Sequence, residues 1–292
     1  MLLKIATLAE LKAFRNSARS AGKLALVPTM GNLHDGHIAL IKLAKQHASL
    51  VVASIFVNPS QFGPNEDFAA YPRTLAADYD ALAQAGCDAV FVPAVALMYP
   101  GIPINAALAG QAEATSVHVQ GISEILCGAV RPGHFRGVAT VVAKLFNLVQ
   151  PDVAIFGQKD FQQLLVIKTM VRDLNFPVEI VSAMTQREQG GLARSSRNQY
   201  LSASERENAR VIYATLLQMR HSFETGESVS AIEQNAQQRL QESGLVPDYA
   251  TVRDAQTLDF VNEKSTRWVA LVAAKLGKTR LIDNLSWPVK PS

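Results

Sequence analysis

The chain has 292 residues, of which 48% are hydrophobic and 18% charged, enough to bury the core of one large or two moderate domains. Its 28 Lys and Arg and 25 Asp and Glu give a formal charge of +3, which does not require a nucleic acid partner and fits anionic small molecules. Two Cys residues, no recognisable signal peptide and no apolar run of about 18 residues predict a cytoplasmic protein without disulfides or membrane spans.

Apolar segments typical of strands alternate with helical patterns through the first part of the chain. The predicted strands are 24–27, 50–57, 89–92, 153–156 and 178–181, and the predicted helices are 36–48, 74–85, 138–149 and 160–174. Strands this apolar are expected to be covered on both faces, and helical crossovers imply parallel pairing. The pattern predicts an α/β fold with a doubly wound parallel sheet, whose ligands gather beyond the carboxyl ends of the strands.

The character of the sequence changes after about residue 201. Two helices with polar faces are predicted at 204–223 and 228–243, and short strands at 249–253, 268–273 and 281–282. The candidate N-caps are Ser202 or Ser204 for the first helix and Ser228 or Ser230 for the second. This order predicts a smaller α+β domain, and we place the two domains at residues 1–190 and 191–292.

The clearest chemical signal is the segment that follows the first of these strands, Pro28-Thr29-Met30-Gly31-Asn32-Leu33-His34-Asp35-Gly36-His37. It predicts a strand end, a tight turn and a helix start, where unpaired N–H groups and the helix dipole favour an anion. Gly31 and Gly36 allow the backbone to approach a ligand closely. With imidazole donors at His34 and His37, the segment favours a triphosphate. A metal-ligand pair, which lacks the usual third and fourth ligands, and two ordinary surface histidines are the alternatives.

Two loops in the first half carry side chains that suit acidic ligands. Residues 58–64 read Asn-Pro-Ser-Gln-Phe-Gly-Pro, in which the Gln61 amide offers a donor and an acceptor to a hydroxy acid. A plain turn with a solvated amide explains this loop equally well. Residues 131–137 read Arg-Pro-Gly-His-Phe-Arg-Gly, which predicts either a phosphate or carboxylate site or a basic surface loop.

Two later loops suit phosphates. Gly157-Gln158-Lys159-Asp160 directly follows the strand at 153–156, which places Lys159 to meet a phosphate and Asp160 to cap a helix or bind a ribose or metal ion. Gln163 lies about one turn later on the same face. The run Arg194-Ser195-Ser196-Arg197-Asn198 suits a triphosphate and its departing pyrophosphate, although such runs are often exposed linkers.

Taken in order, these motifs resemble the pantothenate synthetase family, which are pantoate–β-alanine ligases of the nucleotidyltransferase superfamily. The matching segments are 28–37, 58–63, 131–135, 157–160, 195–198 and the ending Gly277-Lys278-Thr279-Arg280-Leu281-Ile282-Asp283-Asn284. The resemblance covers nearly the whole chain. It implies a Rossmann-like ATP- and pantoate-binding domain related to class I aminoacyl-tRNA synthetases, a second domain that closes over the active site, and a cytoplasmic enzyme that is usually a homodimer and uses magnesium.

The resemblance further implies a two-step ligase reaction of the coenzyme A pathway. The carboxylate of (R)-pantoate attacks the α-phosphate of ATP to give pantoyl adenylate and pyrophosphate, and the amine of β-alanine then releases AMP to give pantothenate. The implied catalytic positions are His37, as proton donor, with His34 and Lys159. Gln61 and Gln163 are implied to hold pantoate. The implied ATP contacts are Met30, Gly31, Asn32, Leu33, His34, Asp35, Gly36, His37, Gly157, Gln158, Lys159, Asp160, Gln186, Arg194, Ser195, Ser196 and Arg197.

The chain departs from the family pattern at Gln158, usually Glu, at Gln186, usually apolar, and at Arg194, usually Met or Leu. Gln186 puts an apolar contact to the adenine in doubt and leaves its main chain to bind the base. The Arg194 charge is too costly to bury unpaired, so it either adds a phosphate contact or points to solvent. No magnesium ligands are assigned, since Ala76-Ala77-Asp78 keeps only one carboxylate.

Two other functions remain compatible with the residues. A nucleotidyltransferase that forms a dinucleotide product would share His34 and His37 without needing the pantoate glutamines. A non-catalytic nucleotide-binding protein would keep the scaffold without the reaction. Product analysis separates them, because the ligase releases AMP whereas the transferase retains it in a dinucleotide.

Overall fold

The computed structural model describes residues 1–64, 66–102 and 115–288. The chain divides into two compact units, Met1–Gly157 with Val166–Met184, and Gln158–Leu165 with Thr185–Ser292. The division after Met184 comes six residues before the predicted boundary at 190, and the second unit also includes the short segment 158–165. Within the described residues, the structure has no helix with the length and apolar character that a membrane crossing requires.

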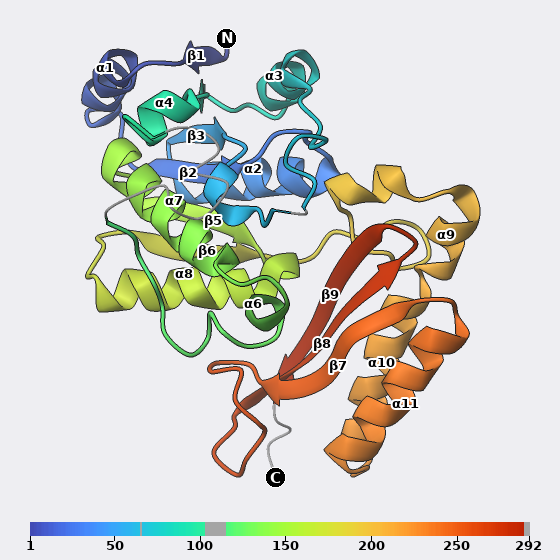
Figure 1. The fold of residues 1–292 in the computed structure, drawn as a ribbon. Helices are drawn as coiled ribbons and strands as arrows, with labels where there is room; N and C mark the ends of the chain where they lie inside the picture. Colours follow the sequence, from blue (N-terminus) through green and yellow to red (C-terminus); the bar gives the residue numbers. More distant parts are fainter. Residues whose placement is uncertain (65, 103–114, 289–292) are drawn as a thin grey trace. The chain divides into compact units, whose positions relative to one another are not determined.

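The first unit contains a six-stranded sheet in which all neighbouring strands run parallel, in the order β1-β4-β3-β2-β5-β6 (Figure 1). The strands are β1 (Leu3–Ile5), β2 (Leu24–Thr29), β3 (Leu50–Ile55), β4 (Ala89–Phe91), β5 (Val153–Gly157) and β6 (Glu179–Ala183). From β2 the chain builds outward to β3 and β4, then returns to build β5 and β6 on the other side. The carboxyl ends of β2 and β5 therefore flank a reversal of strand order, where doubly wound sheets bind ligands.

Helices cover both faces of this sheet, which confirms the predicted α/β class. The helices and 3₁₀ turns up to β6 are α1 (Leu8–Ala18), α2 (Asp35–His47), η1 (Pro59–Gln61), α3 (Leu75–Gln84), α4 (Val95–Met98), α6 (Cys127–Val130), α7 (His134–Val149), η2 (Gln158–Asp160) and α8 (Phe161–Asp173). Right-handed crossovers place α2 and α3 on one face and α1, α7 and α8 on the other. Figure 1 shows α7 and α2 on opposite sides of the strands.

The core between the sheet and α2 explains why the central strands are apolar at nearly every position. Ile41 and Ala44 of α2 pack with Leu82 of α3 against one set of strand side chains, which includes Val27 and Val51. Alternate strand residues point to the other face, where they are covered as well. Burial on both faces removes the polar alternation that an exposed sheet shows.

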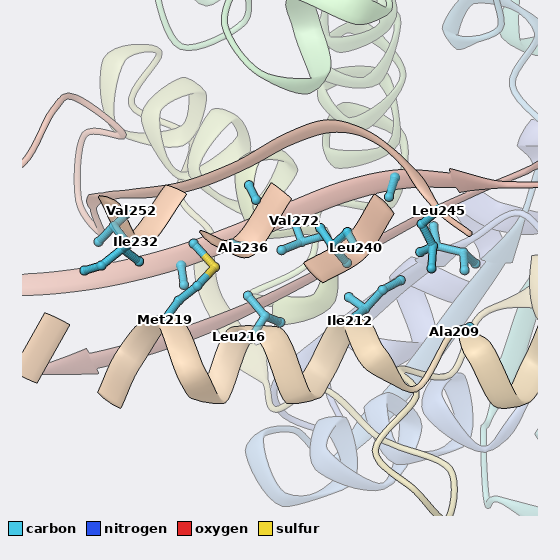
Figure 2. Close-up of a cluster of buried hydrophobic side chains, with 14 of the residues drawn as sticks. Ala209, Ile212, Leu216, Met219, Ile232, Ala236, Leu240, Leu245, Val252 and Val272 are labelled. Carbon is cyan, nitrogen blue, oxygen red and sulfur yellow. The ribbon is translucent and has the colours of Figure 1, made fainter. Parts of the chain in front are cut away.

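The second unit contains an antiparallel sheet in the order β7-β8-β9 and two packed helices (Figure 1). Its elements after β6 are η3 (Ser196–Tyr200), α9 (Ala203–Asn208), α10 (Val211–Glu224), α11 (Val229–Glu242), β7 (Val246–Asp254), β8 (Arg267–Leu276) and β9 (Thr279–Pro288). In Figure 2, α10 and α11 direct apolar side chains toward one another and toward the strands. Ile212, Leu216 and Met219 of α10 recur at helical spacing and face Ile232 of α11.

The structure corrects the predicted elements in several places, and the strands β7, β8 and β9 are all longer than the predicted 249–253, 268–273 and 281–282. The pattern predicts one helix at 204–223, whereas a turn at Ala209 and Arg210 separates α9 from α10. The pattern also omits β1 and α1, because a three-residue edge strand carries too little periodicity to recognise. For α1 a local signal exists, since the Thr7 hydroxyl and the Glu10 carboxylate form a capping box. Of the two candidate N-caps given for each helix, the structure shows Ser202 at α9 and Ser228 at α11.

Candidate active site

Two residues with left-handed backbone angles shape the turn after β2. Gly31 has φ 82° and Asn32 has φ 49°. The N–H of Gly31 donates to Oγ1 of Thr29 at 3.2 Å, and that hydroxyl donates to the carbonyl of Ser54 on β3 at 2.7 Å. A Cβ at position 31 would lie 3.1 Å from the Asp78 carboxylate. Both the backbone angle and the available space therefore require glycine at this position.

The Asp78 carboxylate, from α3, holds this turn in place. The residue is only 2% exposed. Its Oδ2 accepts the main-chain N–H of Asn32 at 3.1 Å, and its Oδ1 accepts the N–H of Leu33 at 2.8 Å and the hydroxyl of Thr74 at 3.1 Å. A buried carboxylate is tolerated when its oxygens accept such bonds. Nothing near Asp78 in the sequence predicts this contact, because the residues that Asp78 binds lie 45 and 46 positions earlier in the chain.

The two histidines lie at the start of α2 as predicted, with His34 as N-cap and His37 in the first turn. Nδ1 of His34 accepts the N–H of Gly36 at 3.0 Å, and Nδ1 of His37 accepts the N–H of His34 at 3.3 Å. The ring centroids are 4.1 Å apart. A neutral imidazole that accepts through Nδ1 carries its proton on Nε2. Each of the two rings at the helix start therefore carries its proton on Nε2, and the neighbouring Asp35 is exposed.

A buried amide orients Gln61, the last residue of the turn η1. The Nδ2 group of Asn58 donates to Oε1 of Gln61 at 3.1 Å and to the carbonyl of Gly137 at 3.2 Å, while its Oδ1 accepts the Tyr99 hydroxyl at 2.5 Å. The Nε2 group of Gln61 consequently faces Met30 and lies 3.1 Å from its sulfur. The structure thus brings together Met30 and Gln61, which are both predicted site residues. Asn58, whose amide orients Gln61, was not among the predicted site residues.

The basic loop at 131–137 binds a carboxylate of the protein itself. Arg131 forms a bidentate pair with Glu66, with Nε 2.7 Å from Oε1 and Nη2 2.5 Å from Oε2. Burial opposes ionisation of Glu66, but the hydrogen bond and charge of Arg131 outweigh it and hold the pKa of that carboxyl below its ordinary value. The ring of His134 lies 2.9 Å through Nδ1 from the carbonyl of Gln61. The loop at 131–137 therefore contacts the main chain of Gln61.

The predicted nucleotide loop 157–160 is divided, because Gly157 is the last residue of β5 in the first unit, whereas residues 158–160 form the turn η2 in the second unit. Gln158, Lys159 and Asp160 are all half-buried, and Gln163 is half-buried in the first turn of α8. The carbonyls of Gln158 and Lys159 each accept a hydrogen bond from Nδ2 of Asn284 on β9, at 2.9 Å in both cases. Asn284 lies in the segment 277–284 that resembles the family ending, and the resemblance predicts no role for it.

The remaining predicted contacts lie on a hairpin-like loop that leads into η3. The N–H of Arg194 donates to the carbonyl of Gln186, whose side chain is exposed. Ser195 caps η3, since its hydroxyl accepts the N–H of Arg197 at 3.3 Å, and Ser196 and Arg197 are half-buried. Arg194 is half-buried too. Burial raises the pKa of the nearby Glu188, but the hydrogen bonds from Arg206 and Asn198 outweigh it and lower the pKa overall. The positive charge of Arg194 adds to this lowering.

The described residues contain no group of three or more His, Cys, Asp or Glu side chains arranged to hold a metal ion. The one carboxylate in the segment considered for magnesium, that of Asp78, already accepts three hydrogen bonds from the protein. This donor set does not fit a dedicated magnesium site, which needs carboxylate oxygens that face the ion. The predicted meeting of His37 with Lys159, which belong to different units, stays a prediction.

Comparisons with known proteins cover almost the full chain. The sequence model of the pantoate–β-alanine ligase family matches residues 4–286. The pantothenate synthetase of Stutzerimonas stutzeri is 56% identical over 283 residues, which are 96% of each chain, and that of Stenotrophomonas maltophilia is 53% identical over 97% of this chain and all of its own length.

Solved structures agree. The pantothenate synthetase of Thermus thermophilus superposes with a TM-score of 0.88 at 45% identity, over 97% of this chain and 99% of the other. A Francisella tularensis pantoate–β-alanine ligase, solved with β,γ-ATP and β-alanine, superposes with a TM-score of 0.80 at 32% identity, over 98% of this chain and 97% of the other. Because the match is full-length in sequence and in fold, the chain belongs to the pantoate–β-alanine ligase family.

Proposed function

We propose that the chain condenses (R)-pantoate with β-alanine to form pantothenate in an ATP-dependent reaction that passes through pantoyl adenylate. The observation that carries this proposal is the start of α2, where His34 and His37 lie side by side and each accepts a main-chain N–H group through Nδ1. The family match over residues 4–286 supports the reaction. The Francisella tularensis relative, solved with an ATP species and β-alanine, supports two of the three substrates.

In the first step a pantoate carboxylate oxygen bonds to the α-phosphorus of ATP, and the bond from that phosphorus to the bridging oxygen of pyrophosphate breaks. Negative charge develops on the phosphoryl oxygens and the leaving pyrophosphate. We assign the Nε2–H groups of His34 and His37 and the ammonium of Lys159 to these oxygens, because fixed donors stabilise developing charge strongly. His37 is the proton donor in this sense.

In the second step the β-alanine amine attacks the acyl carbon of pantoyl adenylate, an amide bond forms, and AMP leaves with the electrons of the acyl–oxygen bond. The protein contributes mainly by holding the two reactants in line. We assign Gln61 and Gln163 to pantoate. The Nε2 donor of Gln61, which is oriented by Asn58, suits a carboxylate or hydroxyl oxygen of pantoate.

The further ATP contacts are proposed from the family correspondence. Two of the loops that carry them have main-chain groups bound by a distant side chain, by Asp78 at residues 32–33 and by Asn284 at residues 158–159. The proposed residues are Met30, Gly31, Asn32, Leu33, Asp35, Gly36, Gly157, Gln158, Asp160, Gln186, Arg194, Ser195, Ser196 and Arg197. The closing of the second domain over the active site is part of the same proposal.

Three finer features also rest on the resemblance. We propose a homodimer in the cytoplasm, and magnesium as a companion of the ATP phosphates. Since the described residues do not fit a dedicated magnesium site, no step of the reaction is assigned to a protein-bound ion. Magnesium that arrives with a nucleotide usually keeps several water ligands and few protein ligands.

Arg194 is the departure from the family with the greatest chemical consequence. Its two alternatives, a phosphate contact and a solvent-facing charge, differ in the effect of Arg194→Met on the dissociation constant of ATP. A phosphate contact raises that constant in the variant, since a charge-assisted hydrogen bond is lost. An unchanged constant excludes the contact. Lys278→Met, an exposed cation on the turn before β9, is a control for the loss of one positive charge.

Identification of products tests the whole proposal. Purified protein is incubated with ATP, magnesium, pantoate and β-alanine, and each substrate is omitted in turn. We expect pantothenate and AMP only in the complete mixture, and pyrophosphate both in the complete mixture and in the mixture without β-alanine. A dinucleotide product would establish the transferase alternative. No turnover of ATP with any combination would favour the non-catalytic nucleotide-binding protein.

A further inference from the structure

The strand β9 carries two adjacent side chains that reach the loops of the second unit. Both of them, Asp283 and Asn284, are buried, at 4% and 6% exposure. They lie in the segment that matches the family ending, and the reaction proposed above gives them no part. Asn284 contacts the turn η2, and Asp283 contacts Arg187, whose guanidinium also binds the carbonyl of Gly191.

The Asn284 amide binds the two peptide groups on either side of Lys159. Its Nδ2 group donates one hydrogen bond to the carbonyl of Gln158 and one to the carbonyl of Lys159, both at 2.9 Å. Because both neighbours are acceptors, the amide nitrogen and not its oxygen must face the turn. The first carbonyl belongs to the peptide plane before the Lys159 Cα and the second to the plane after it. Holding both planes fixes φ and ψ of Lys159, and with them the direction of its Cα–Cβ bond.

Asn284 is itself held from two sides. Its main-chain N–H donates to Oδ1 of Asp283 at 2.8 Å, and its carbonyl accepts from Nη2 of Arg187 at 3.3 Å. Asp283 forms a bidentate pair with Arg187, at 2.5 Å and 3.1 Å, and the guanidinium lies 3.8 Å from the ring centroid of Tyr213. Such a planar, stacked pair leaves the guanidinium little freedom. The main chain that carries the Asn284 amide is therefore held by residues with little freedom to move.

The same ion pair reaches the second predicted phosphate loop. Nη1 of Arg187 also donates to the carbonyl of Gly191 at 3.0 Å. Gly191, at φ 93°, leads into the bridge between Arg187 and Ala193, directly before the run from Arg194 to Arg197. One buried network thus supports the main chain of both loops that carry ATP contacts in this unit.

We infer that Asn284 is a positioning residue for ATP binding, which acts by setting the backbone of Lys159, and that the Arg187–Asp283 pair holds Asn284 in place. The inference rests on the proposed function in that Lys159 is taken to contact ATP. Asn284 touches no reacting atom. Its effect is therefore expected in the affinity for ATP and to pass through Lys159.

The test is a double-mutant cycle on the full chain, with the dissociation constant of ATP measured by calorimetry without the other substrates. Asn284→Ala is expected to raise this constant about tenfold, the size that one or two lost hydrogen bonds produce. In a Lys159→Ala background the same change is expected to alter it less than about twofold, because residues that act through one another are not additive. The KM for β-alanine is expected to stay within about twofold in the single variant.

Two further variants separate positioning from general damage. Asn284→Asp preserves the shape of the side chain but replaces the NH2 group, which donates both hydrogen bonds, by a carboxylate oxygen that faces the two carbonyls. This variant should therefore weaken ATP binding at least about tenfold. Asn235→Ala removes an exposed amide on α11 that binds Glu227, and serves as the matched control with unchanged ATP affinity. Thermal melting of every variant identifies those that are folded.

An unchanged dissociation constant in folded Asn284→Ala and Asn284→Asp overturns the inference. An equal effect of Asn284→Ala with and without Lys159 overturns it as well, since the residue would then act on the unit as a whole. A wild-type chain that binds ATP but forms no pantothenate contradicts the proposed function and leaves this inference standing. A wild-type chain that binds no ATP contradicts both.

Discussion

Asp78 accepts the main-chain N–H of Leu33 at 2.8 Å, and this bond joins α3 to the turn that precedes α2. A second bond from Asn32 to the same carboxylate holds the turn through two successive peptide groups. The start of α2, with its two histidines, is therefore held by a side chain from another helix. The conformation of this turn depends on α3 as much as on its own glycine.

Asp78→Ala is expected to lower the free energy of unfolding by about 2–4 kcal/mol, because it leaves two main-chain N–H groups and the Thr74 hydroxyl without their charged acceptor. The variant should also bind ATP more weakly. Urea denaturation and ATP titration measure the two effects. Asp80→Ala, an exposed acid on the same helix, is the control and should alter the unfolding energy by less than about 0.5 kcal/mol. A stable Asp78→Ala with normal ATP affinity would contradict the assigned role.

His37→Ala is expected to slow the formation of pantoyl adenylate by about 10²–10³-fold, the usual cost of removing a donor to developing charge. The fold should survive, since the Nδ1 atom of His37 accepts a single main-chain hydrogen bond. Rapid-quench measurement of the adenylate, with thermal melting, checks both statements. His47→Ala, exposed at the other end of α2, should react at the parent rate. Adenylate formation at the parent rate in His37→Ala would show that its assigned role is wrong.

Gln61→Ala should raise the KM for pantoate by about tenfold or more and the KM for ATP by less than about threefold, because the oriented Nε2 donor is assigned to pantoate alone. Steady-state kinetics with each substrate varied in turn provides the comparison. Gln84→Ala removes an exposed amide at the end of α3 and should leave both constants unchanged. Equal losses for pantoate and ATP would argue against the assignment.

The Glu66–Arg131 pair is expected to give a pH-dependent contribution to stability. The pKa of Glu66 is lowered in the folded protein, so its contribution is fully present above the unfolded pKa of about 4.3 and is lost as the pH falls through the folded pKa. At pH 7, Glu66→Gln should lower the free energy of unfolding by about 1 kcal/mol, a modest figure because solvent screens the partly exposed pair.

Urea denaturation between pH 7 and pH 3 tests this sign. The difference between the parent and Glu66→Gln should shrink as the pH falls below about 4. Glu263→Gln, an exposed acid in the second unit, should show no such trend. If the difference in unfolding free energy between the parent and Glu66→Gln grows toward low pH, ionised Glu66 does not stabilise the fold through Arg131.

The helix α2 and the strands beside it show how much of the fold can be predicted from local sequence patterns. Ile41 and Ala44 recur at helical spacing, and the apolar strands on either side are buried on both faces, so the doubly wound sheet follows from hydrophobic periodicity alone. The edge strand β1 and the break between α9 and α10 escaped prediction. Three residues carry no usable period, and a turn inside a helical pattern depends on how the two halves pack.

The sequence by itself determined the class of the fold and the family, and it predicted the loops that carry the chemistry. These are encoded in short segments, such as the one from Pro28 to His37. Only the tertiary structure decided what holds the loops: Asp78 for Leu33, Glu66 for Arg131, and Asn284 for Lys159 across 125 residues of chain. A buried donor must find a partner wherever packing provides one, and no spacing along the chain records which distant side chain that is.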